Sequence, residues 1–333
     1  MGLRETGSLN LEEMGRRNRR ITSKLTPLRF NGIGRKIDQS EKYQRMTMGE
    51  QEARLALLPA NALKGKRLGI SASDSPDLGR LGVSEAQFRI TLGELARTVV
   101  NAGGDLFYGG HLQPEGLTRV LLKELERYGR DDRPLKVCLS WTVHRKMTAE
   151  QLRQQQKIAG AYGEIRCLGP NGQHMKAPSE EPPIAEFAAE ESATALSNLR
   201  AYMTANTDAR IVIGGKRAGF QGAMPGILEE ILFSLENRKP LYLAGGFGGA
   251  TLDAIRVLRP ADADWIPNLP NAVEPDPRLL HALDRLREVV AITGFDGYEN
   301  GLTKDENRLL AASYRPSEIA ALIGRGMGRL LRK

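Results

Sequence analysis

The feature that most constrains the fold is a regular alternation of short apolar runs and helix-forming segments between residues 66 and 258. Each run is short enough for a buried strand, and the segments between the runs carry apolar residues at helical spacing. Strand-then-helix alternation is typical of a parallel sheet with helices on both faces. We therefore predict an α/β fold with a doubly wound, mostly parallel, Rossmann-like sheet. The expected strands are 66–73, 105–110, 135–141, 164–169, 209–215 and 240–246.

The segments on either side of this region have a different character. Residues 1–65 form a basic N-terminal arm, in which "TMGEQEARLALL" (47–58) predicts a short helix with Thr47 and Glu50 as a capping box. Residues 66–260 form the predicted nucleotide-binding domain, and residues 261–333 form a helical C-terminal tail. A Pro-rich stretch, "GPNGQHMKAPSEEPP" (169–183), is long enough to serve as a lid over an active site.

The net charge of +8 is concentrated in the arm, because residues 1–66 hold 14 Lys and Arg against 7 Asp and Glu. Such an arm is able to contact nucleic acid or an acidic partner. The alternative is an arm that packs on its own domain or on another subunit. We favour this alternative, because acidic residues are interspersed among the basic ones and aromatic residues are few.

Composition excludes several classes of protein. No run of about 18 apolar residues occurs, so we expect no membrane partner, and the start "MGLRETGSLN" has no secretory h-region. We therefore expect a cytoplasmic protein. Cys138 and Cys167 lie in apolar runs and are expected to be buried free thiols. Four scattered histidines without a CxxC motif argue against a metal site, and we expect no required cofactor.

Unusual loops follow several of the predicted strands. They are "SASDSPDLGRLG" (71–82), "YGGHLQPEG" (108–116), "GGKRAGFQGAMPG" (214–226) and "AGGFGGAT" (244–251). Ligands of open α/β sheets bind outside the carboxyl ends of the strands, which is where these loops meet. Glycine lets a ligand approach backbone N–H groups, and a helix N-terminus behind the loop attracts anions. The loops match neither the P-loop nor the G-x-G-x-x-G fingerprint, and they predict a phosphorylated, nucleotide-like ligand.

These loops also carry a resemblance to a known family. The pair "GGKRAGFQGAMPGILEE" and "LYLAGGFGGAT" resembles the two glycine motifs of the SLOG superfamily, the Rossmann-like group named for the Smf/DprA and LOG proteins. "GISASDSPDLGRLGVSEAQF" and "GGDLFYGGHLQPEGLT" resemble the prokaryotic branch found in bacterial nucleotide signalling and conflict systems. The resemblance covers residues 66–260. It implies either a sensor of nucleotides or ADP-ribose-type molecules, or a LOG-type hydrolase of nucleotide N-glycosidic bonds.

The LOG pattern P-G-G-x-G-T-x-x-E is altered here to "AGGFGGATLDAI", in which Ala244 replaces the Pro and Asp253 is the nearest carboxylate. Glycosidic cleavage needs a carboxylate near the anomeric carbon. Glu230 and Asp253 are the catalytic candidates, and Glu229 and Asp74 are further carboxylates near the predicted site. Of the adjacent pair Glu229 and Glu230, at most one faces the site.

The expected ligand-binding residues come from the four loops. They are Ser71, Ser73, Asp74, Gly109, Gly110, Gly214, Gly215, Lys216, Arg217, Gly219, Gly222, Met224, Pro225, Gly226, Gly245, Gly246, Phe247, Gly248, Gly249, Ala250 and Thr251. We expect phosphates against 214–226 and 245–250, with ribose and base against 71–75 and 108–111. Lys216 and Arg217 either pair with phosphate or are solvated, and His111 and Tyr108 are weaker candidates.

Three functions follow from these patterns. The first is a non-catalytic nucleotide sensor or effector, expected to form a homo-oligomer, which the altered "AGGFGGATLDAI" favours. The second is a LOG-like hydrolase or transferase acting on a nucleotide N-glycosidic bond. The third is DprA-like nucleic-acid binding through the basic arm, which we do not favour.

Overall fold

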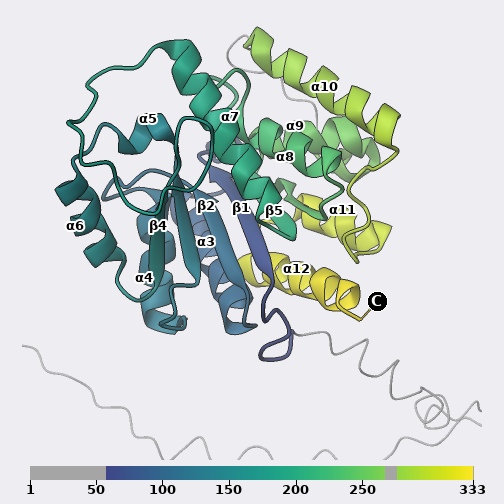
Figure 1. Cartoon of the computed structure of the whole chain (residues 1–333). Helices are drawn as coiled ribbons and strands as arrows, with labels where there is room; N and C mark the ends of the chain where they lie inside the picture. Colours follow the sequence, from purple (N-terminus) through teal and green to yellow (C-terminus); the bar gives the residue numbers. More distant parts are fainter. Residues whose placement is uncertain (1–57, 267–275, 333) are drawn as a thin grey trace, which may run out of the picture. The chain divides into compact units, whose positions relative to one another are not determined.

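The computed structural model describes residues 58–266 and 276–332, all within one compact unit. Six parallel strands form a single sheet in the order β4-β3-β2-β1-β5-β6, which confirms the predicted α/β fold (Figure 1). The strands are β1 (Arg67–Ser73), β2 (Asp105–Gly109), β3 (Leu135–Leu139), β4 (Gly163–Cys167), β5 (Ala209–Gly214) and β6 (Leu241–Ala244).

The order of the strands creates a switch point between β1 and β5. The chain first runs outward from β1 to β4, then crosses back to β5 on the other side of β1. Strand β1 pairs with β2 from Arg67 to Ile70 and with β5 from Leu68 to Ser73. The ends of β1, β2 and β5 therefore open toward the same edge of the sheet, where a doubly wound fold binds its ligand.

Helices cover both faces of the sheet. Helices α3, α4 and α12 pack together on one face, and α7 and α8 cover the other (Figure 1). The helices are α3 (Glu85–Asn101), α4 (Leu117–Tyr128), α5 (Trp141–His144), α6 (Ala149–Ala159), α7 (Ala189–Ala205), α8 (Gly226–Glu236), α9 (Gly249–Leu258), α10 (Pro277–Thr293), α11 (Lys304–Ala312) and α12 (Pro316–Leu330). Short 3-10 turns are η2 (Gly79–Leu81), η3 (Gly245–Phe247) and η4 (Pro260–Ala263). The helical tail predicted from the sequence is thus present as α10, α11 and α12.

Local capping explains where several helices begin. The Ser84 hydroxyl accepts the Gln87 amide hydrogen at 3.1 Å, and Thr148 and Gln151 form a capping box. Helix α4 has Gly116 as its N-cap and Leu117 as its first residue.

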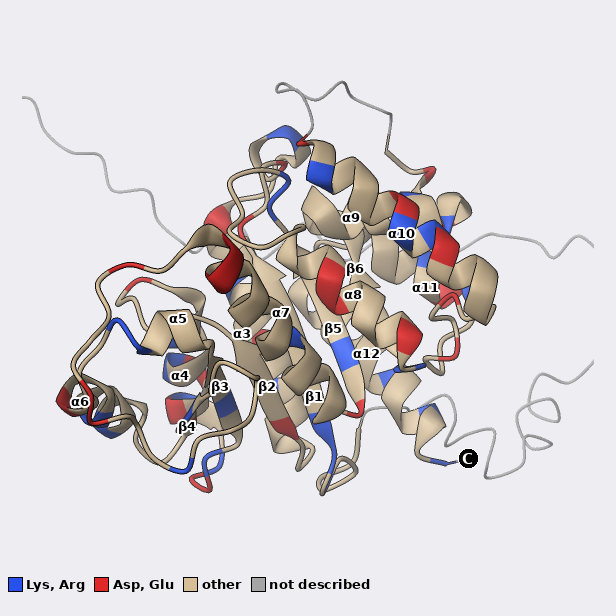
Figure 2. Cartoon of the chain, turned by 45° about the horizontal axis from the view of Figure 1, so that its top comes forward, with Lys and Arg blue, Asp and Glu red and all other residues tan. Residues whose placement is uncertain are grey.

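Buried apolar side chains fill the space between the sheet and the helices. Strand β5 is buried along its whole length, as expected for a central strand with helices on both faces. Cys138 and Cys167 are buried free thiols, as predicted. Charged side chains of both signs lie on α6 and α10, whereas the strands are mostly uncharged (Figure 2). Within the described part of the chain, no helix has the length and apolar character needed to cross a bilayer.

Two of the segments predicted from the sequence lie largely outside the described residues. The predicted helix at 47–58 falls almost entirely within residues 1–57, and so does most of the basic arm. The limits assigned to the arm, domain and tail stay predictions.

Candidate functional site

A cavity of about 690 Å³ opens at the carboxyl edge of the sheet, at the switch point between β1 and β5. Residues 70–75 at the end of β1 form its floor, together with Tyr108 and Gly109 at the end of β2. Helix α3 contributes Phe88 and Arg89, and α7 contributes Leu196, Leu199 and Arg200. The volume is in the range of small-molecule and cofactor sites.

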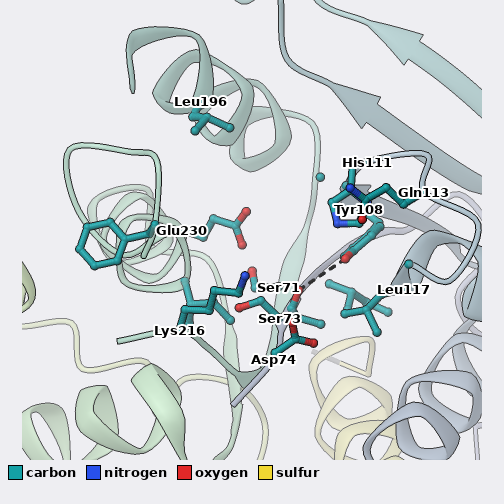
Figure 3. A pocket seen from close by; sticks show the side chains of 18 of the residues that line it. Ser71, Ser73, Asp74, Tyr108, His111, Gln113, Leu117, Leu196, Lys216 and Glu230 are labelled. Carbon is teal, nitrogen blue, oxygen red and sulfur yellow. Dashed lines mark hydrogen bonds between the residues drawn. The ribbon is translucent and has the colours of Figure 1, made fainter. Parts of the chain in front are cut away.

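Part of the predicted site lines this cavity. The residues concerned are Ser71, Ser73, Asp74, Gly109, Gly110, Lys216, Gly226 and the catalytic candidate Glu230. They come from three separate loops and from α8, so the fold brings together segments far apart in the sequence. Figure 3 shows Lys216 and Glu230 on one side of the space, with Tyr108 and His111 across from them.

The remaining predicted residues lie outside the cavity lining. They are Gly214, Gly215, Arg217, Gly219, Gly222, Met224, Pro225, Gly245, Gly246, Phe247, Gly248, Gly249, Ala250, Thr251 and Asp253. Residues 169–183, expected as a lid, do not line it either. Arg145 holds the end of that stretch by donating to the Glu181 and Pro182 carbonyl oxygens at 3.1 and 3.0 Å.

The second glycine motif is closed by packing. Residues 244–251 are buried, and the ring of Phe247 packs edge-on against Phe88 with centroids 5.5 Å apart. A Cβ on Gly246 would clash with the Ser313 carbonyl oxygen, which follows α11. A Cβ on Gly248, where φ is +70°, would lie 2.5 Å from the Asp77 side chain. The glycines here are required because other parts of the protein approach the backbone closely.

A protein carboxylate occupies the N-terminus of α9. Asp77 accepts the Gly249 amide hydrogen at 2.8 Å and pairs with Arg217 at 2.7 Å. Arg217 in turn pairs with Asp253 at 2.6 Å. Burial alone would raise the pKa of Asp77, but the hydrogen bonds from Arg217 and Gly249 hold it below its ordinary value. Arg217 and Asp253 thus form a network outside the cavity.

Helix α8, in contrast, has a free N-terminus in the cavity. No side chain in the described part of the chain caps it, and its first residues, Gly226 and Ile227, line the cavity. Arg200 from α7 lies against this end, because a Cβ on Gly226 would be 2.5 Å from Arg200 Nη2. Arg200 Nη1 pairs with the Glu229 carboxylate, while Nε and Nη2 have no hydrogen-bond partner within the described ranges. Unpaired N–H groups therefore converge on the start of α8.

Lys216 adds a second cation to the same end of the cavity. It is exposed and takes part in none of the ion pairs between described residues. The neighbouring Arg217 points instead to Asp77 and Asp253. The sequence left open whether Lys216 and Arg217 pair with phosphate or are solvated. In the structure Lys216 is exposed at the cavity, whereas Arg217 is ion-paired outside it.

A buried arginine fixes the position of Glu230. Arg210 is 1% exposed, and its Nη1 lies 3.3 Å from the Glu230 carboxylate. It also donates to Ser71 at 3.0 Å, Thr204 at 2.8 Å and Ser234 at 2.9 Å. Burial lowers the pKa of Arg210, and the charge of Glu230 opposes this effect. Arg210 was not among the expected site residues, although a charged residue inside the apolar run "ARIVIGG" is a signal for a buried ion pair.

Tyr108 supplies a neutral phenol to the cavity floor. Burial raises its pKa, and the negative charges of Glu230 and Asp74 raise it further. Its hydroxyl lies 3.5 Å from the Ala72 carbonyl oxygen, its hydrogen-bond partner (Figure 3). Tyr108 therefore stays protonated at neutral pH and can act as a hydrogen-bond donor.

The fold and the cavity together define a Rossmann-like protein with its pocket at the topological switch point of a parallel sheet. The chain belongs to the SLOG cluster2 family, whose sequence model matches residues 62–310. This match confirms the resemblance to the SLOG superfamily and extends it at both ends. No curated protein and no solved structure matches the chain.

Proposed function

We propose that the cavity binds a nucleotide or an ADP-ribose-type ligand, and that the protein acts as a sensor or effector of such a molecule. The observation that carries the proposal is the free N-terminus of α8 beside Arg200 and Lys216. A helix N-terminus with two cations is a favourable environment for phosphate oxygens.

The rest of the cavity suits the remainder of a nucleotide. Ser73 ends β1 and the exposed Asp74 follows it, and both offer acceptors for ribose hydroxyls. The Tyr108 hydroxyl donates to the Ala72 carbonyl oxygen and offers its lone pairs as a further acceptor. Apolar side chains from α5 and α7 border the cavity on the β2 and β3 side. A nucleotide whose phosphate lies at α8 would place its ribose over the end of β1 and its base toward β2.

The geometry favours a sensor over a LOG-type enzyme, because Arg217 engages one of the two expected carboxylates, Asp253. The Asp77 carboxylate also accepts a hydrogen bond from the Gly249 amide of the second glycine motif. Residues 244–251 therefore make contacts within the protein, and in this proposal the phosphate binds only at residues 214–226. Signalling through self-association, which we expect of such a sensor, is part of this proposal.

Calorimetric titration of the full chain with AMP, ADP, NAD and ADP-ribose tests the proposal. Lys216→Gln removes an exposed charge without breaking an ion pair, and we expect it to weaken binding about tenfold. Lys157→Gln on α6 is the matched control, because Lys157 is also exposed and does not line the cavity. Absence of binding to all four compounds, or equal affinities of the two variants, would contradict the proposal.

Turnover of the ligand is the second candidate function, and the position of Glu230 favours it. Its carboxylate lines the cavity and is held by Arg210, so it is available to an anomeric carbon. Incubation with AMP, NAD and ADP-ribose, followed by detection of free base, separates the two functions. Product formation that is lost in Glu230→Gln would establish the enzyme and reject the pure sensor.

A further inference from the structure

One buried hydroxyl group in the cavity wall has no partner. Ser140 follows β3, lines the cavity and is 1% exposed, and its Oγ has no hydrogen-bond partner among the described residues. Buried polar side chains are nearly always satisfied, so an orphaned hydroxyl beside a cavity needs an explanation. A bound molecule that fills the cavity would supply the missing partner.

Apolar side chains line the cavity beside Ser140. Val143 lies in the same turn, since its amide donates to the Ser140 carbonyl oxygen at 3.1 Å. Across from α5, helix α7 contributes Leu196 and Leu199. The end of β2 contributes Gly109, where a Cβ would be 3.4 Å from the Leu199 side chain. This end of the cavity is therefore lined by Val143, Leu196 and Leu199, and Gly109 adds no side chain to it.

The charged lining residues belong to other parts of the cavity wall than α5. Lys216, Glu230 and Arg200 lie near the start of α8, Asp74 follows β1, and Glu85, Arg89 and Glu115 line the side formed by α3 and the loop before α4. The cavity thus has a cationic end for phosphate and an uncharged end with a single hydroxyl. A nucleobase is flat and largely apolar, and it carries hydrogen-bonding groups at its edge, which matches the uncharged end.

We propose that the uncharged end of the cavity is a nucleobase subsite in which Ser140 hydrogen-bonds the edge of the base. This inference rests on the proposed function and deepens it, because it assigns the base to Ser140, Val143, Leu196 and Leu199. The phosphate remains at the start of α8. The ligand then extends from the β5 side of the cavity to the β3 side, across the end of β1.

Two probes separate the base subsite from the phosphate site. AMP and ribose 5-phosphate share a ribose and a phosphate, and they differ in the base. We expect the wild-type chain to bind AMP more tightly than ribose 5-phosphate. Ser140→Ala should weaken AMP binding about tenfold, the loss of a single well-placed hydrogen bond, and leave ribose 5-phosphate unaffected.

Thermal stability provides an independent readout. The Ser140 hydroxyl makes no hydrogen bond to another described residue, so Ser140→Ala should leave the melting temperature unchanged or raise it. Ser313→Ala is the matched control, because Ser313 is also buried but its hydroxyl donates to Glu318 at 2.5 Å, away from the cavity. This control should lower the melting temperature and leave AMP binding intact.

Each outcome of these measurements supports or overturns the nucleobase subsite. Selective loss of AMP affinity in Ser140→Ala, with the melting temperature retained, supports the base subsite. Unchanged AMP affinity, or an equal loss for AMP and ribose 5-phosphate, overturns it while the proposed nucleotide site stands. Failure of the wild-type chain to bind AMP overturns the subsite, and failure to bind ADP, NAD and ADP-ribose as well overturns the proposed function.

Discussion

The Asp77 carboxylate accepts a hydrogen bond from the Gly249 amide at 2.8 Å, at the residue where α9 begins. The side chain thus takes the place that an anion would take at a helix N-terminus. Gly248 and Gly249 adopt positive φ angles of 70° and 65° beside it. In this structure the second glycine motif is buried and makes protein contacts, whereas no described side chain caps the N-terminus of α8.

Removing the Asp77 carboxylate should destabilise the protein. Asp77→Ala leaves Arg217 short of one partner in a largely buried network, where the Asp77 side chain is 5% exposed. We expect a loss of about 3 kcal/mol in the free energy of unfolding, measured by urea denaturation. Asp284→Ala is the control, since Asp284 forms an exposed pair with Arg287 and should cost about 0.5 kcal/mol. Similar losses in the two variants would contradict the buried network.

A methyl group at Gly226 should impair the phosphate site. The Cβ of Gly226→Ala would lie 2.5 Å from Arg200 Nη2 and displace the guanidinium from the start of α8. We expect AMP affinity to fall about tenfold, as for the loss of a charge-assisted hydrogen bond. Gly79→Ala is the matched control, because a Cβ there meets nothing within 4 Å. If the two alanine variants bind AMP equally well, Arg200 has no part in the site.

Arg210 should tolerate no replacement, even by lysine. An ammonium group cannot reproduce the fork that contacts Ser71, Thr204 and Ser234 together. We expect Arg210→Lys to lower the free energy of unfolding by about 3 kcal/mol, because it leaves buried groups unpaired. Arg285→Lys on α10 serves as the control, since Arg285 is exposed and pairs only at the surface. Equal stability of the two variants would show that the Arg210 contacts are dispensable.

Acid should weaken the attachment of α12 to α11 through Glu306. Burial alone would raise the pKa of this carboxyl, but the hydrogen bonds from Arg329 and Arg325 lower it from 4.5 to about 2. Because the folded pKa lies below the unfolded value, the stabilisation is complete above pH 4.5 and is lost as the pH falls toward 2. The comparison of interest is therefore between wild type and Glu306→Gln at several pH values.

Glu306→Gln keeps a side-chain oxygen for the Thr303 capping box and removes the ion pairs. The variant should be less stable than the wild type at pH 7, and the difference should shrink steadily below pH 4.5. Urea unfolding at pH 7, 4 and 3 measures this difference. A difference that is independent of pH would contradict the role of the Glu306 charge.

The fold could be predicted because its signals are local. The apolar run of β5 and the capping residues Ser84 and Thr148 act within a few residues of themselves. The edge of the sheet that holds the cavity was also predictable, because all strand ends of a parallel sheet meet there.

The sequence could not predict that residues 244–251 are buried while the loop 214–226 borders the cavity. This difference depends on contacts with residues far away in the sequence. Ser313 and Asp77 close the second motif from opposite ends of the sequence. Arg200 contacts the end of the loop 214–226 from α7. The sequence of α7 contains no glycine and no motif that indicates phosphate binding. Such contacts are set by how the helices pack on the sheet, and a motif alone does not encode them.

Photoaffinity labelling tests the central claim, that this cavity holds the nucleotide, most directly. The full chain is irradiated with 8-azido-AMP, with and without excess AMP, and the labelled peptides are mapped by mass spectrometry. We predict competed labels within residues 108–117, 140–143 and 196–200, which surround the uncharged end of the cavity. Competed labels at 245–251 instead, or none that AMP suppresses, would contradict the account.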